Sequence, residues 1–390
     1  MSGNAGVISR TSVCALFVLP FLCSCATLTS MNPFAARGSE IQPLQETPEG
    51  HRLVLVEWRS SAGTSGDFDL VPAQFNEASV VASKDGLISR IDAGRTVWTT
   101  RVDAVISGAV AANQDIVVAG TSRADLIAFG MADGVERWRA KAGSEILAVP
   151  SLTGNIVIAK SGDSKIWAFD QRTGKQLWTY QRSNPPLSLR SSAGVEVDGD
   201  KVFAGFPGGK LVALAISDGR VLWESAISTP KGATELERMT DVAGLPQLAG
   251  SGHVCAVAFQ GSVTCLDAKT GATSWSRPTS STVGIGVNSA TVYVAADDGS
   301  VSSYDSSTGA LRWRTEVLKG REPTRPIPLG DYVAVMDGAG YLHLLDQKSG
   351  TVVALKRVAT GSTTSVPVGT DKLLIQARIG EVVMVRLGKS

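Results

Sequence analysis

Pairs of short apolar runs recur along the chain at a nearly constant interval. In one copy, residues 116–119 and 126–129 are continuous apolar runs separated by a turn, and a mixed segment that ends at Trp138 follows them. The same pair recurs at 156–159 with 166–169 and at 292–295 with 301–304. Runs of this length without alternation are typical of strands that are buried on both faces. The more polar last segment, as at 136–139, indicates an outer strand that faces water.

The turn before each last segment has its clearest copy at residues 170–178, which read D-Q-R-T-G-K-Q-L-W. Asp170 can accept hydrogen bonds from backbone N–H groups two residues on, and Gly174 can adopt a positive φ, so the stretch predicts a hairpin corner followed by a strand. Further copies, some of them looser, lie at 92–98, 130–138, 215–223, 267–275, 305–313 and, without a Trp, 346–355. We expect their recurring aspartates to cap turns and not to take part in catalysis.

The spacing between the residues that end these copies gives the length of the repeat. They are Trp58, Trp98, Trp138, Trp178, Trp223, Trp275 and Trp313, at intervals of 40, 40, 40, 45, 52 and 38 residues, and Leu355 follows 42 residues later as the expected eighth position. Units of about 40 residues with four strands each are the signature of a β-propeller. We therefore predict an all-β fold, an eight-bladed β-propeller of four-stranded antiparallel blades.

The two ends of the repeat region predict how the ring closes. Residues 54–58 precede any complete unit, whereas the C-terminal end supplies two strands, 372–377 and 381–387, without a closing Trp. We expect the N-terminal strand to join the last blade as its outer strand. An open ring of seven blades with extra strands is the alternative.

The first residues are typical of a targeting segment. Arg10 precedes an apolar run at 13–22, which is about half the length that spans a bilayer and fits a signal-peptide core. The following Leu22-Cys23-Ser24-Cys25 resembles a bacterial lipobox, which predicts a signal peptide at 1–24 and a lipid anchor on Cys25. Ala26 in place of Asp resembles lipoproteins that continue to the outer membrane, on its periplasmic face. A plain secretory signal with incidental cysteines is the alternative.

Composition divides the rest of the chain into a tether and a folded body. Residues 25–50 are rich in Ser, Thr, Pro and small residues without periodicity, which predicts a flexible tether. Residues 51–390 form the predicted propeller. With 43% hydrophobic and 19% charged residues, the chain has ample material for a globular core.

Two intervals exceed the common period of 40 residues, by 5 and by 12. The extra residues follow Trp178 and Trp223, where they connect the outer strand of one blade to the inner strand of the next. Such connections lie on the face opposite the Asp-Gly corners, and long loops on a rigid scaffold commonly carry binding. Candidate contact residues, which combine apolar anchors with both charges, are Leu187, Leu189, Arg190, Leu236, Arg238 and Asp241. Loops that merely cover the end of the propeller are the alternative.

Charge and motif content argue against several function classes. A formal net charge of +1, without a cluster of Lys or Arg, gives no electrostatic basis for binding nucleic acid. His51, His253 and His343 are isolated from further ligands at metal spacing, and the chain has no Ser-His-Asp signature or phosphate-binding glycine loop. We expect no catalytic residue, no metal and no cofactor.

Cys255 and Cys265 flank a turn at Gln260-Gly261. They could face each other across two strands and form a disulfide in an oxidising compartment. Two buried free thiols are the alternative, because cross-strand disulfide geometry is demanding.

Taken together, these features resemble the BamB family, the lipoprotein subunits of the outer-membrane β-barrel assembly machinery. The Trp-ended repeats are also similar to those of pyrroloquinoline-quinone (PQQ) enzymes. The lipobox, the length, the eight units and the loop motifs L-S-L-R at 187–190 and A-T-E-L-E-R-M-T-D-V at 233–242 carry the more specific resemblance. It covers nearly the whole chain after the signal peptide.

The resemblance implies a non-catalytic scaffold that binds a periplasmic POTRA domain of BamA and assists the folding and insertion of outer-membrane proteins. It also implies membership of the assembly complex, transient contact with unfolded outer-membrane precursors, and membrane attachment through the lipid anchor only. The matching contact positions are Leu187, Leu189, Arg190 and Asp241. A second acidic position of the family pattern is Ala243 here, which departs from it.

A periplasmic enzyme or sensor of the PQQ quinoprotein dehydrogenase type is the alternative function. Such an enzyme would need calcium bound by carboxylate and amide oxygens, a catalytic Asp and usually a Cys-Cys pair over the cofactor. The sequence contains no Cys-Cys pair.

Overall fold

The computed structural model describes residues 1–3, 43–44, 53–190 and 192–388. The chain divides into two units, Met1–Gly38 and Ser39–Ser390. In the first unit only residues 1–3 are described, and they have no regular secondary structure. The expected signal peptide, Cys25 and most of the expected tether therefore lie outside the described residues. The described residues contain no helix with the length and apolar character that crossing a membrane requires.

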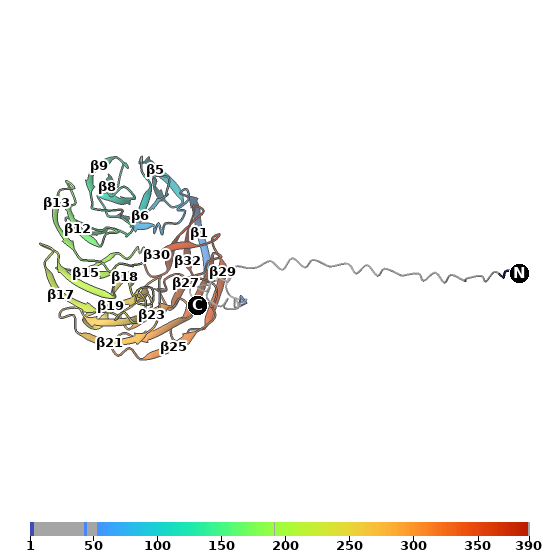
Figure 1. Cartoon of the computed structure of the whole chain (residues 1–390). Helices are drawn as coiled ribbons and strands as arrows, with labels where there is room; N and C mark the ends of the chain where they lie inside the picture. Colours follow the sequence, from blue (N-terminus) through green and yellow to red (C-terminus); the bar gives the residue numbers. More distant parts are fainter. Residues whose placement is uncertain (4–42, 45–52, 191, 389–390) are drawn as a thin grey trace. The chain divides into compact units, whose positions relative to one another are not determined.

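The second unit consists of eight four-stranded antiparallel sheets that follow one another around a ring (Figure 1). Blade 1 comprises β2 (Ala73–Phe75), β3 (Ala78–Ala82), β4 (Leu87–Asp92) and β5 (Arg95–Arg101), and blade 2 comprises β6 (Ile106–Ala112), β7 (Ile116–Thr121), β8 (Asp125–Gly130) and β9 (Glu136–Lys141). Blade 3 comprises β10 (Ser151–Thr153), β11 (Ile156–Lys160), β12 (Lys165–Asp170) and β13 (Gln176–Gln181), and blade 4 comprises β14 (Val195–Asp198), β15 (Lys201–Phe206), β16 (Lys210–Ala215) and β17 (Val221–Ala226). In each blade the first strand is innermost and the last is at the circumference.

Blades 5 to 8 continue this order. Blade 5 comprises β18 (Val242–Ala249), β19 (His253–Ala258), β20 (Ser262–Asp267) and β21 (Thr273–Pro278), and blade 6 comprises β22 (Ile285–Val287), β23 (Thr291–Ala295), β24 (Val301–Asp305) and β25 (Leu311–Thr315). Blade 7 comprises β26 (Ile327–Leu329), β27 (Tyr332–Met336), β28 (Tyr341–Asp346) and β29 (Val352–Arg357), and blade 8 comprises β30 (Thr363–Val368), β31 (Lys372–Ala377), β32 (Glu381–Leu387) and β1 (Val54–Ser61). A short 3₁₀ turn, η1 (Gly250–Gly252), separates β18 from β19. The predicted eight-bladed propeller is confirmed.

The N-terminal strand closes the ring. β1 pairs antiparallel with β32 from Val54 opposite Leu387 to Ser61 opposite Glu381. In Figure 1 the blue β1 lies beside the red β32. Ion pairs from Glu57 to Lys372, at 3.0 Å, and to Arg386 reinforce this pairing. The last blade therefore contains both ends of the propeller, as the sequence predicts.

The core is a ring of eight hydrophobic clusters, one between each pair of adjacent blades in the described residues. Middle strands contribute to two clusters at once. In β11, Val157 and Ala159 face blade 2, whereas Ile158 between them faces blade 4. Because successive side chains of a strand point to opposite faces, a strand between two sheets needs apolar residues at every position. This requirement explains the continuous apolar runs in the sequence.

The outer strands follow a different pattern. In β13 only Trp178 is buried, while its neighbours are exposed or partly exposed. Each outer strand also carries a β-bulge one residue before the Trp position. The bulged residues are Glu57, Val97, Arg137, Leu177, Leu222, Ser274, Arg312 and Val353. A bulge bends and twists its strand. The residues between the corner and the bulge therefore pair with the third strand in a register that differs by one residue from that of the Trp and the residues after it.

In the described residues, seven of the eight blades are joined to the next blade by one of these tryptophans. The indole N–H of Trp138 donates to the carbonyl of Gln171 at 2.7 Å, and Trp178 donates to Ile216 at 2.8 Å. Trp98, Trp223, Trp275 and Trp313 make the same contact to Met131, Ala268, Ser306 and Gln347. The ring of each Trp lies against the corner glycine of the next blade, and a Cβ on Gly174 would be only 2.7 Å from the Trp138 ring.

The eighth Trp position is Ala354, so the expectation of Leu355 is wrong by one residue. Leu344 pairs with Ala354 and Leu345 with Val352, which places the bulge at Val353 and Ala354 where other blades have Trp. Ala354 is fully buried. Blade 8 has no corner between its last two strands, because the chain ends after β32 and begins again at β1. A Trp on blade 7 would have no corner to contact.

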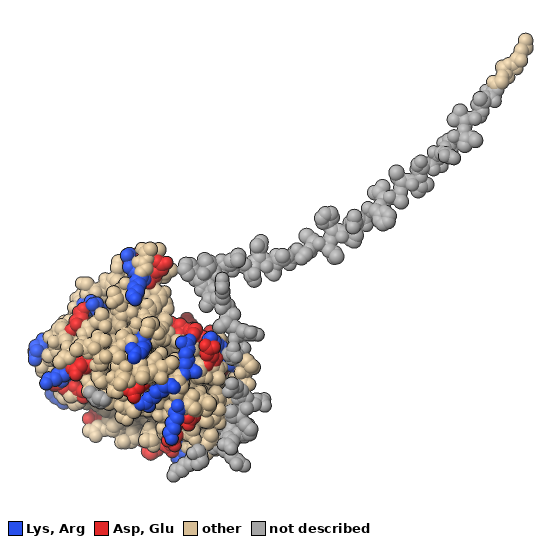
Figure 2. Space-filling view, turned by 90° about the horizontal axis from the view of Figure 1, so that it is seen from below, with Lys and Arg blue, Asp and Glu red and all other residues tan. Residues whose placement is uncertain are grey.

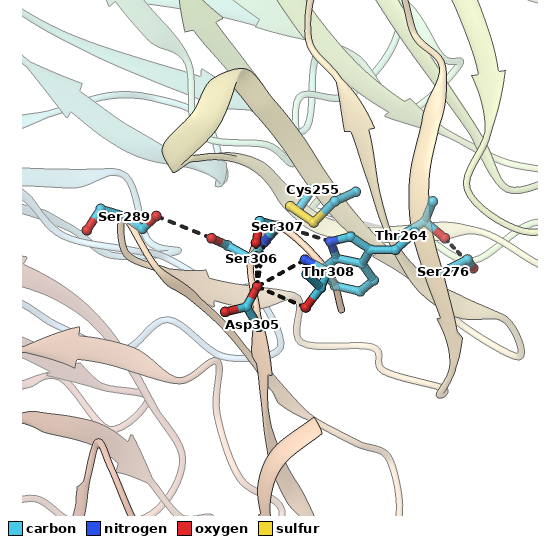
Figure 3. Close-up of a disulfide and its surroundings, with 10 residues drawn as sticks. Cys255, Thr264, Ser276, Ser289, Asp305, Ser306, Ser307 and Thr308 are labelled. Carbon is cyan, nitrogen blue, oxygen red and sulfur yellow. Dashed lines mark hydrogen bonds between the residues drawn. A yellow bond between two sulfur atoms is a disulfide. The ribbon is translucent and has the colours of Figure 1, made fainter. Parts of the chain in front are cut away.

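The two cysteines form a disulfide. Cys255 in β19 lies directly opposite Cys265 in β20, and their sulfurs are bonded (Figure 3). Both are fully buried in the cluster between blades 5 and 6. This outcome decides between the two alternatives that the sequence left open.

Closure by β1 yields a first prediction. Deletion of residues 51–60 should remove most of the outer strand of blade 8 and expose the apolar edge of β32, which lowers the melting temperature strongly or abolishes cooperative unfolding. Thermal unfolding followed by circular dichroism measures this effect. A variant that unfolds cooperatively at the wild-type temperature would contradict closure by β1.

The contact between Trp and corner yields a second prediction, with a matched pair of glycines. Gly174 has φ +70° and lies against Trp138, whereas Gly154 has φ +52° and a Cβ added to it would have no heavy atom within 4 Å. Gly154→Ala should cost about 1 kcal/mol of unfolding free energy for the left-handed backbone alone. Gly174→Ala should cost roughly 2–4 kcal/mol, because the Trp138 ring must also move. Chemical denaturation of both variants measures the difference, and equal losses would show that the ring contact contributes nothing.

Candidate functional site

The two long connections lie on one face of the propeller, here called the insertion face. Residues 182–194 connect β13 to β14, and residues 227–241 connect β17 to β18. The corners at the Asp-Gly motifs join third to fourth strands and therefore lie on the opposite face. The sequence prediction of adjacent insertions opposite the corners is confirmed.

The first loop, residues 182–194, exposes an apolar side chain and contains a guanidinium group that is fixed by an ion pair. Leu187 is 46% exposed, and Leu189 is partly buried. Arg190 donates to both carboxylate oxygens of Glu145, at 3.0 and 2.7 Å, and its guanidinium stacks 5.4 Å from the Phe68 ring centre. The hydrogen bonds from Arg190 lower the pKa of Glu145. A bidentate Arg fork of this kind fixes the geometry of the loop.

Glu145 and Phe68 come from other blades, and sequence reasoning missed both. Glu145 precedes blade 3 and Phe68 precedes β2 of blade 1, so the Arg190 side chain ties the first loop to two further connections of the same face. Nothing in the local sequence of either residue indicates this contact.

The second loop is ordered by a capping box. Glu237 accepts hydrogen bonds from the backbone N–H groups of Ala233 and Thr234, at 2.8 and 3.0 Å, and the Thr234 hydroxyl accepts one from the N–H of Glu237. These bonds lower the pKa of Glu237. The reciprocal arrangement stabilises a single helical turn. That turn leaves Leu236 44% exposed, and Arg238 forms an ion pair with Glu235.

Asp241 joins the two loops from below the surface. Its carboxylate accepts hydrogen bonds from the backbone N–H of Leu189 in the first loop and from that of Gly208 in the turn after β15, the latter at 3.1 Å. Only 2% of Asp241 is exposed. Asp241 is expected as a direct contact residue, and in this structure its charge is used inside the protein, where it accepts hydrogen bonds from backbone N–H groups of Leu189 and Gly208. Ala243, the position that departs from the family pattern, is buried in β18.

A pocket of about 220 Å³ lies between the loops. Its lining includes Glu145, Lys160, Leu189, Arg190 and Asp241. Burial lowers the pKa of Lys160 to about 8, and the charge of Asp241 opposes this effect. Sequence reasoning missed Lys160, although the repeats contain a signal: it ends the run I-V-I-A-K at 156–160 where blades 2 and 4 have glycine in I-V-V-A-G and K-V-F-A-G.

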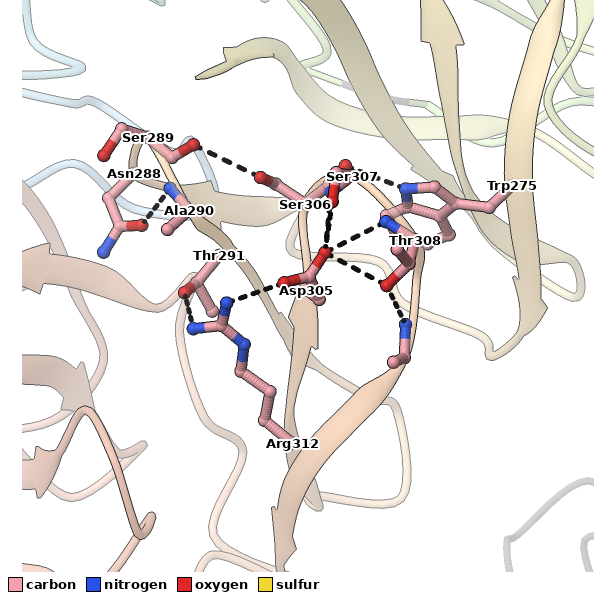
Figure 4. A network of polar contacts seen from close by, with 11 residues as sticks. Trp275, Asn288, Ser289, Ala290, Thr291, Asp305, Ser306, Ser307, Thr308 and Arg312 are labelled. Carbon is pink, nitrogen blue, oxygen red and sulfur yellow. Dashed lines mark hydrogen bonds and ion pairs between the residues drawn. The ribbon is translucent and has the colours of Figure 1, made fainter. Parts of the chain in front are cut away.

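Four corner aspartates, Asp170, Asp267, Asp305 and Asp346, have the turn-capping role expected from the sequence, whereas Asp92 pairs with Arg90. Asp305 accepts hydrogen bonds from the N–H groups of Ser307 and Thr308, both at 3.0 Å, and from their hydroxyls, while its other oxygen pairs with Arg312 (Figure 4). These contacts lower the pKa of Asp305, the hydroxyl of Ser307 most of all. Asp170, Asp267 and Asp346 cap their corners in the same way. Their oxygens are occupied by turn donors.

The two described histidines, His253 and His343, lie on strands of different blades. His343 is buried in β28, where its Nε2 is 3.2 Å from the Asp337 carboxylate, which also lies 3.4 Å from Arg321. His253 begins β19, and His51 is outside the described residues. In the described part of the chain, His, Cys, Asp and Glu side chains form no group of three that could hold a metal ion.

The central channel contains a pair of opposite charges. Glu196 is on the inner strand β14 of blade 4, and Arg325 precedes the inner strand β26 of blade 7. Burial raises the pKa of Glu196 to about 7, and Arg325 opposes this effect. Blades 4 and 7 are not neighbours in the ring, so this electrostatic influence joins residues that are far apart along the chain.

On the face of the described residues that Figure 2 shows, the surface charge gives no sign of a polyanion site. On the face that Figure 2 shows, Lys and Arg side chains are interspersed with Asp and Glu. Ion pairs such as Arg314 with Asp298, at 3.1 Å, contribute to this mixture.

A ring of blades with Trp-ended repeats and two joined insertion loops defines a β-propeller scaffold of the PQQ-repeat class. A family model described as outer membrane protein assembly factor BamB matches residues 84–315 and 261–386. The outer membrane protein assembly factor BamB of Bordetella pertussis is 34% identical over 364 residues, which are 92% of this chain and 94% of that protein. The chain belongs to the BamB family.

Solved structures agree with this family and also show how widely the fold is shared. The crystal structure of BamB from Moraxella catarrhalis matches with a TM-score of 0.80 and 26% identity, over 86% of this chain and all of that one. A quinohemoprotein alcohol dehydrogenase from Pseudomonas putida matches with a TM-score of 0.67 but only 11% identity, over 90% of this chain and 79% of that one. The second match reflects the propeller fold alone. Relatives in the family carry the name of an assembly factor.

The channel carboxylate yields a third prediction. Since the pKa of Glu196 is raised from 4.5 to about 7 on folding, the folded state binds the proton more tightly, and the contribution of Glu196 to stability falls as pH rises from about 4.5 to 7. Glu196→Gln removes this titration. Its melting temperature relative to wild type should therefore be higher at pH 8 than at pH 5.

Thermal unfolding of both proteins at the two pH values measures this difference. The exposed outer-strand variant Glu136→Gln serves as the control for loss of a carboxylate. A Glu196→Gln difference that is the same at pH 5 and pH 8 would contradict the raised pKa.

Proposed function

We propose that this protein is a non-catalytic lipoprotein scaffold of the outer-membrane β-barrel assembly complex. In this proposal it binds a periplasmic POTRA domain of BamA through the insertion face and assists the insertion of outer-membrane proteins. Cys25 carries the lipid that anchors it to the periplasmic face of the outer membrane. Membership of the BamB family and the names of its relatives support this function.

One observation carries the assignment of the surface. The two longest connections between the described blades meet on one face, and Asp241 ties the first of them to the start of β18 at the end of the second. Each of them presents one leucine, Leu187 or Leu236, that is nearly half exposed. Apolar anchors within a polar and charged surround are typical of protein-binding surfaces.

The contact residues divide into two groups in this proposal. Leu187 and Leu236 are apolar anchors that reach the partner. Arg190 and Arg238 have exposed guanidiniums that are already paired with Glu145 and Glu235, so they contribute at the edge of the contact. Leu189 and Asp241 support the surface from beneath it.

The scaffold orients its partner in this proposal, and strand addition by unfolded precursors to the outer strands is the less favoured mode. The outer strand of each described blade lies at the circumference, which motivates strand addition. However, each of these strands carries a β-bulge, and bulged edges resist pairing with further strands. Crosslinking that places precursor segments along outer strands such as β13 would favour strand addition instead.

A catalytic role of the quinoprotein type is not part of the proposal. The aspartates of the corners are occupied by turn donors. A stoichiometric quinone in the purified protein, together with dye-linked oxidation of an alcohol, would contradict the scaffold assignment.

The surface assignment yields a fourth prediction. Replacement of Leu187 by Glu should reduce co-purification of BamA with the full-length chain about tenfold or more, since a buried apolar anchor commonly contributes about 2 kcal/mol or more to binding. Leu189→Glu and Arg190→Glu should also weaken it. Immunoblotting of BamA after affinity purification from membranes measures the effect.

Leu177→Glu is the matched control, because Leu177 is 48% exposed on the outer strand β13, away from the insertion face. It should leave co-purification unchanged. If the Leu187 variant retains BamA at the level of the Leu177 variant, the insertion face is not the partner site, although the fold is unaffected by that result.

A further inference from the structure

A buried cation lies beneath the first loop. Lys160 ends β11 of blade 3, and its side chain lies 5.2 Å from the centre of the Phe206 ring in blade 4. The residue is 9% exposed, and its ammonium group is among the buried donors. Removing an ammonium from water is costly unless polar groups and an opposite charge compensate it.

The hydrogen bonds of Lys160 span the gap between two blades. Its ammonium donates to the carbonyl of Gly205 in β15, at 2.6 Å, and to that of Ala193, at 3.2 Å. Ala193 lies at the end of the first insertion loop, immediately before β14 leads into blade 4. Lys160 therefore holds the end of the loop against blade 4.

Asp241 holds the middle of the same loop. It reaches the N–H of Leu189, whereas Lys160 reaches the carbonyl of Ala193, and both side chains line the same pocket. The charge of Asp241 favours the protonated Lys160. The other charged groups of this pocket are Glu145 and Arg190, which neutralise one another in a bidentate pair.

We infer that Lys160 and Asp241 act together as opposite charges of one pocket that hold the first loop at Ala193 and at Leu189, so that Lys160 is a positioning residue of the binding surface. This inference rests on the proposed function of the insertion face. The two opposite charges line the same pocket, and their hydrogen bonds hold the loop on either side of Arg190, at Leu189 and at Ala193.

The inference predicts different effects for the single variants and the double variant of Lys160 and Asp241. Loss of one partner leaves an uncompensated buried charge, whereas loss of both leaves none. Lys160→Met should therefore disturb Asp241 and the backbone groups that Asp241 holds, even though Lys160 does not contact those groups. A residue that merely fills space would disturb only its own neighbours, Ala193 and Gly205.

Hydrogen exchange of the purified full-length chain, without any partner, tests the pair itself. In Lys160→Met, the amides of Leu189 and Gly208 should exchange at least about tenfold faster than in wild type. The control is Lys165→Met in the same hairpin, where Lys165 pairs with Asp163 at 3.0 Å instead. Unchanged exchange at Leu189 and Gly208 in Lys160→Met would overturn the inference, whatever the partner does.

Titration of the same full-length proteins with the POTRA domains of BamA tests the consequence for binding. Lys160→Met and Asp241→Asn should each weaken binding about tenfold, and the double variant should be no weaker than either single variant, because it contains no uncompensated charge. Effects that multiply in the double variant would overturn the pairing. Absence of binding by wild type would refute the proposed function alone, since hydrogen exchange tests the pair independently.

Discussion

The contact between a tryptophan and the corner of the next blade is the interaction on which this propeller depends. Each sheet is too small to bury its own apolar faces, so the core exists only between blades, as eight separate clusters. The Trp side chain fixes the spacing of adjacent sheets at the circumference, where its N–H satisfies a corner carbonyl and its ring covers a glycine. Where the corner is missing, at the junction of the two chain ends, the Trp is missing too.

A rigid ring of this kind allows two of its connections to lengthen without loss of architecture. The extra residues are not loose, because a capping box orders the second loop and Asp241 joins the first loop to blade 5. In the first loop this order depends on the buried charge of Asp241, and buried charges are costly. Under the proposed function, this cost is consistent with a surface that is ordered before a partner binds, since a preorganised surface loses less entropy on binding.

The candidate site shows which residues a sequence can indicate. The longer intervals located both loops, and the mixture of leucines and charges in them indicated Leu187 and Leu236 as exposed anchors. The charges were harder to interpret. Asp241 is conspicuous in the sequence as an acidic residue of a loop motif, but its carboxylate lies inside, whereas Glu145 and Phe68 have no local signal and become relevant only through contact with Arg190.

The sequence by itself determined the number of blades, the identity of the outer strands and the closure by β1, because these features repeat along the chain and a period can be counted. The tertiary structure alone decided the partners of Asp241, Lys160 and Arg190, the disulfide between Cys255 and Cys265, and the place of Ala354. Leu189 and Asp241 are separated by 52 residues, and what brings them together is the packing of one blade against another. A periodic pattern fixes distances along the chain, whereas contacts between loops depend on how the repeated units pack in space.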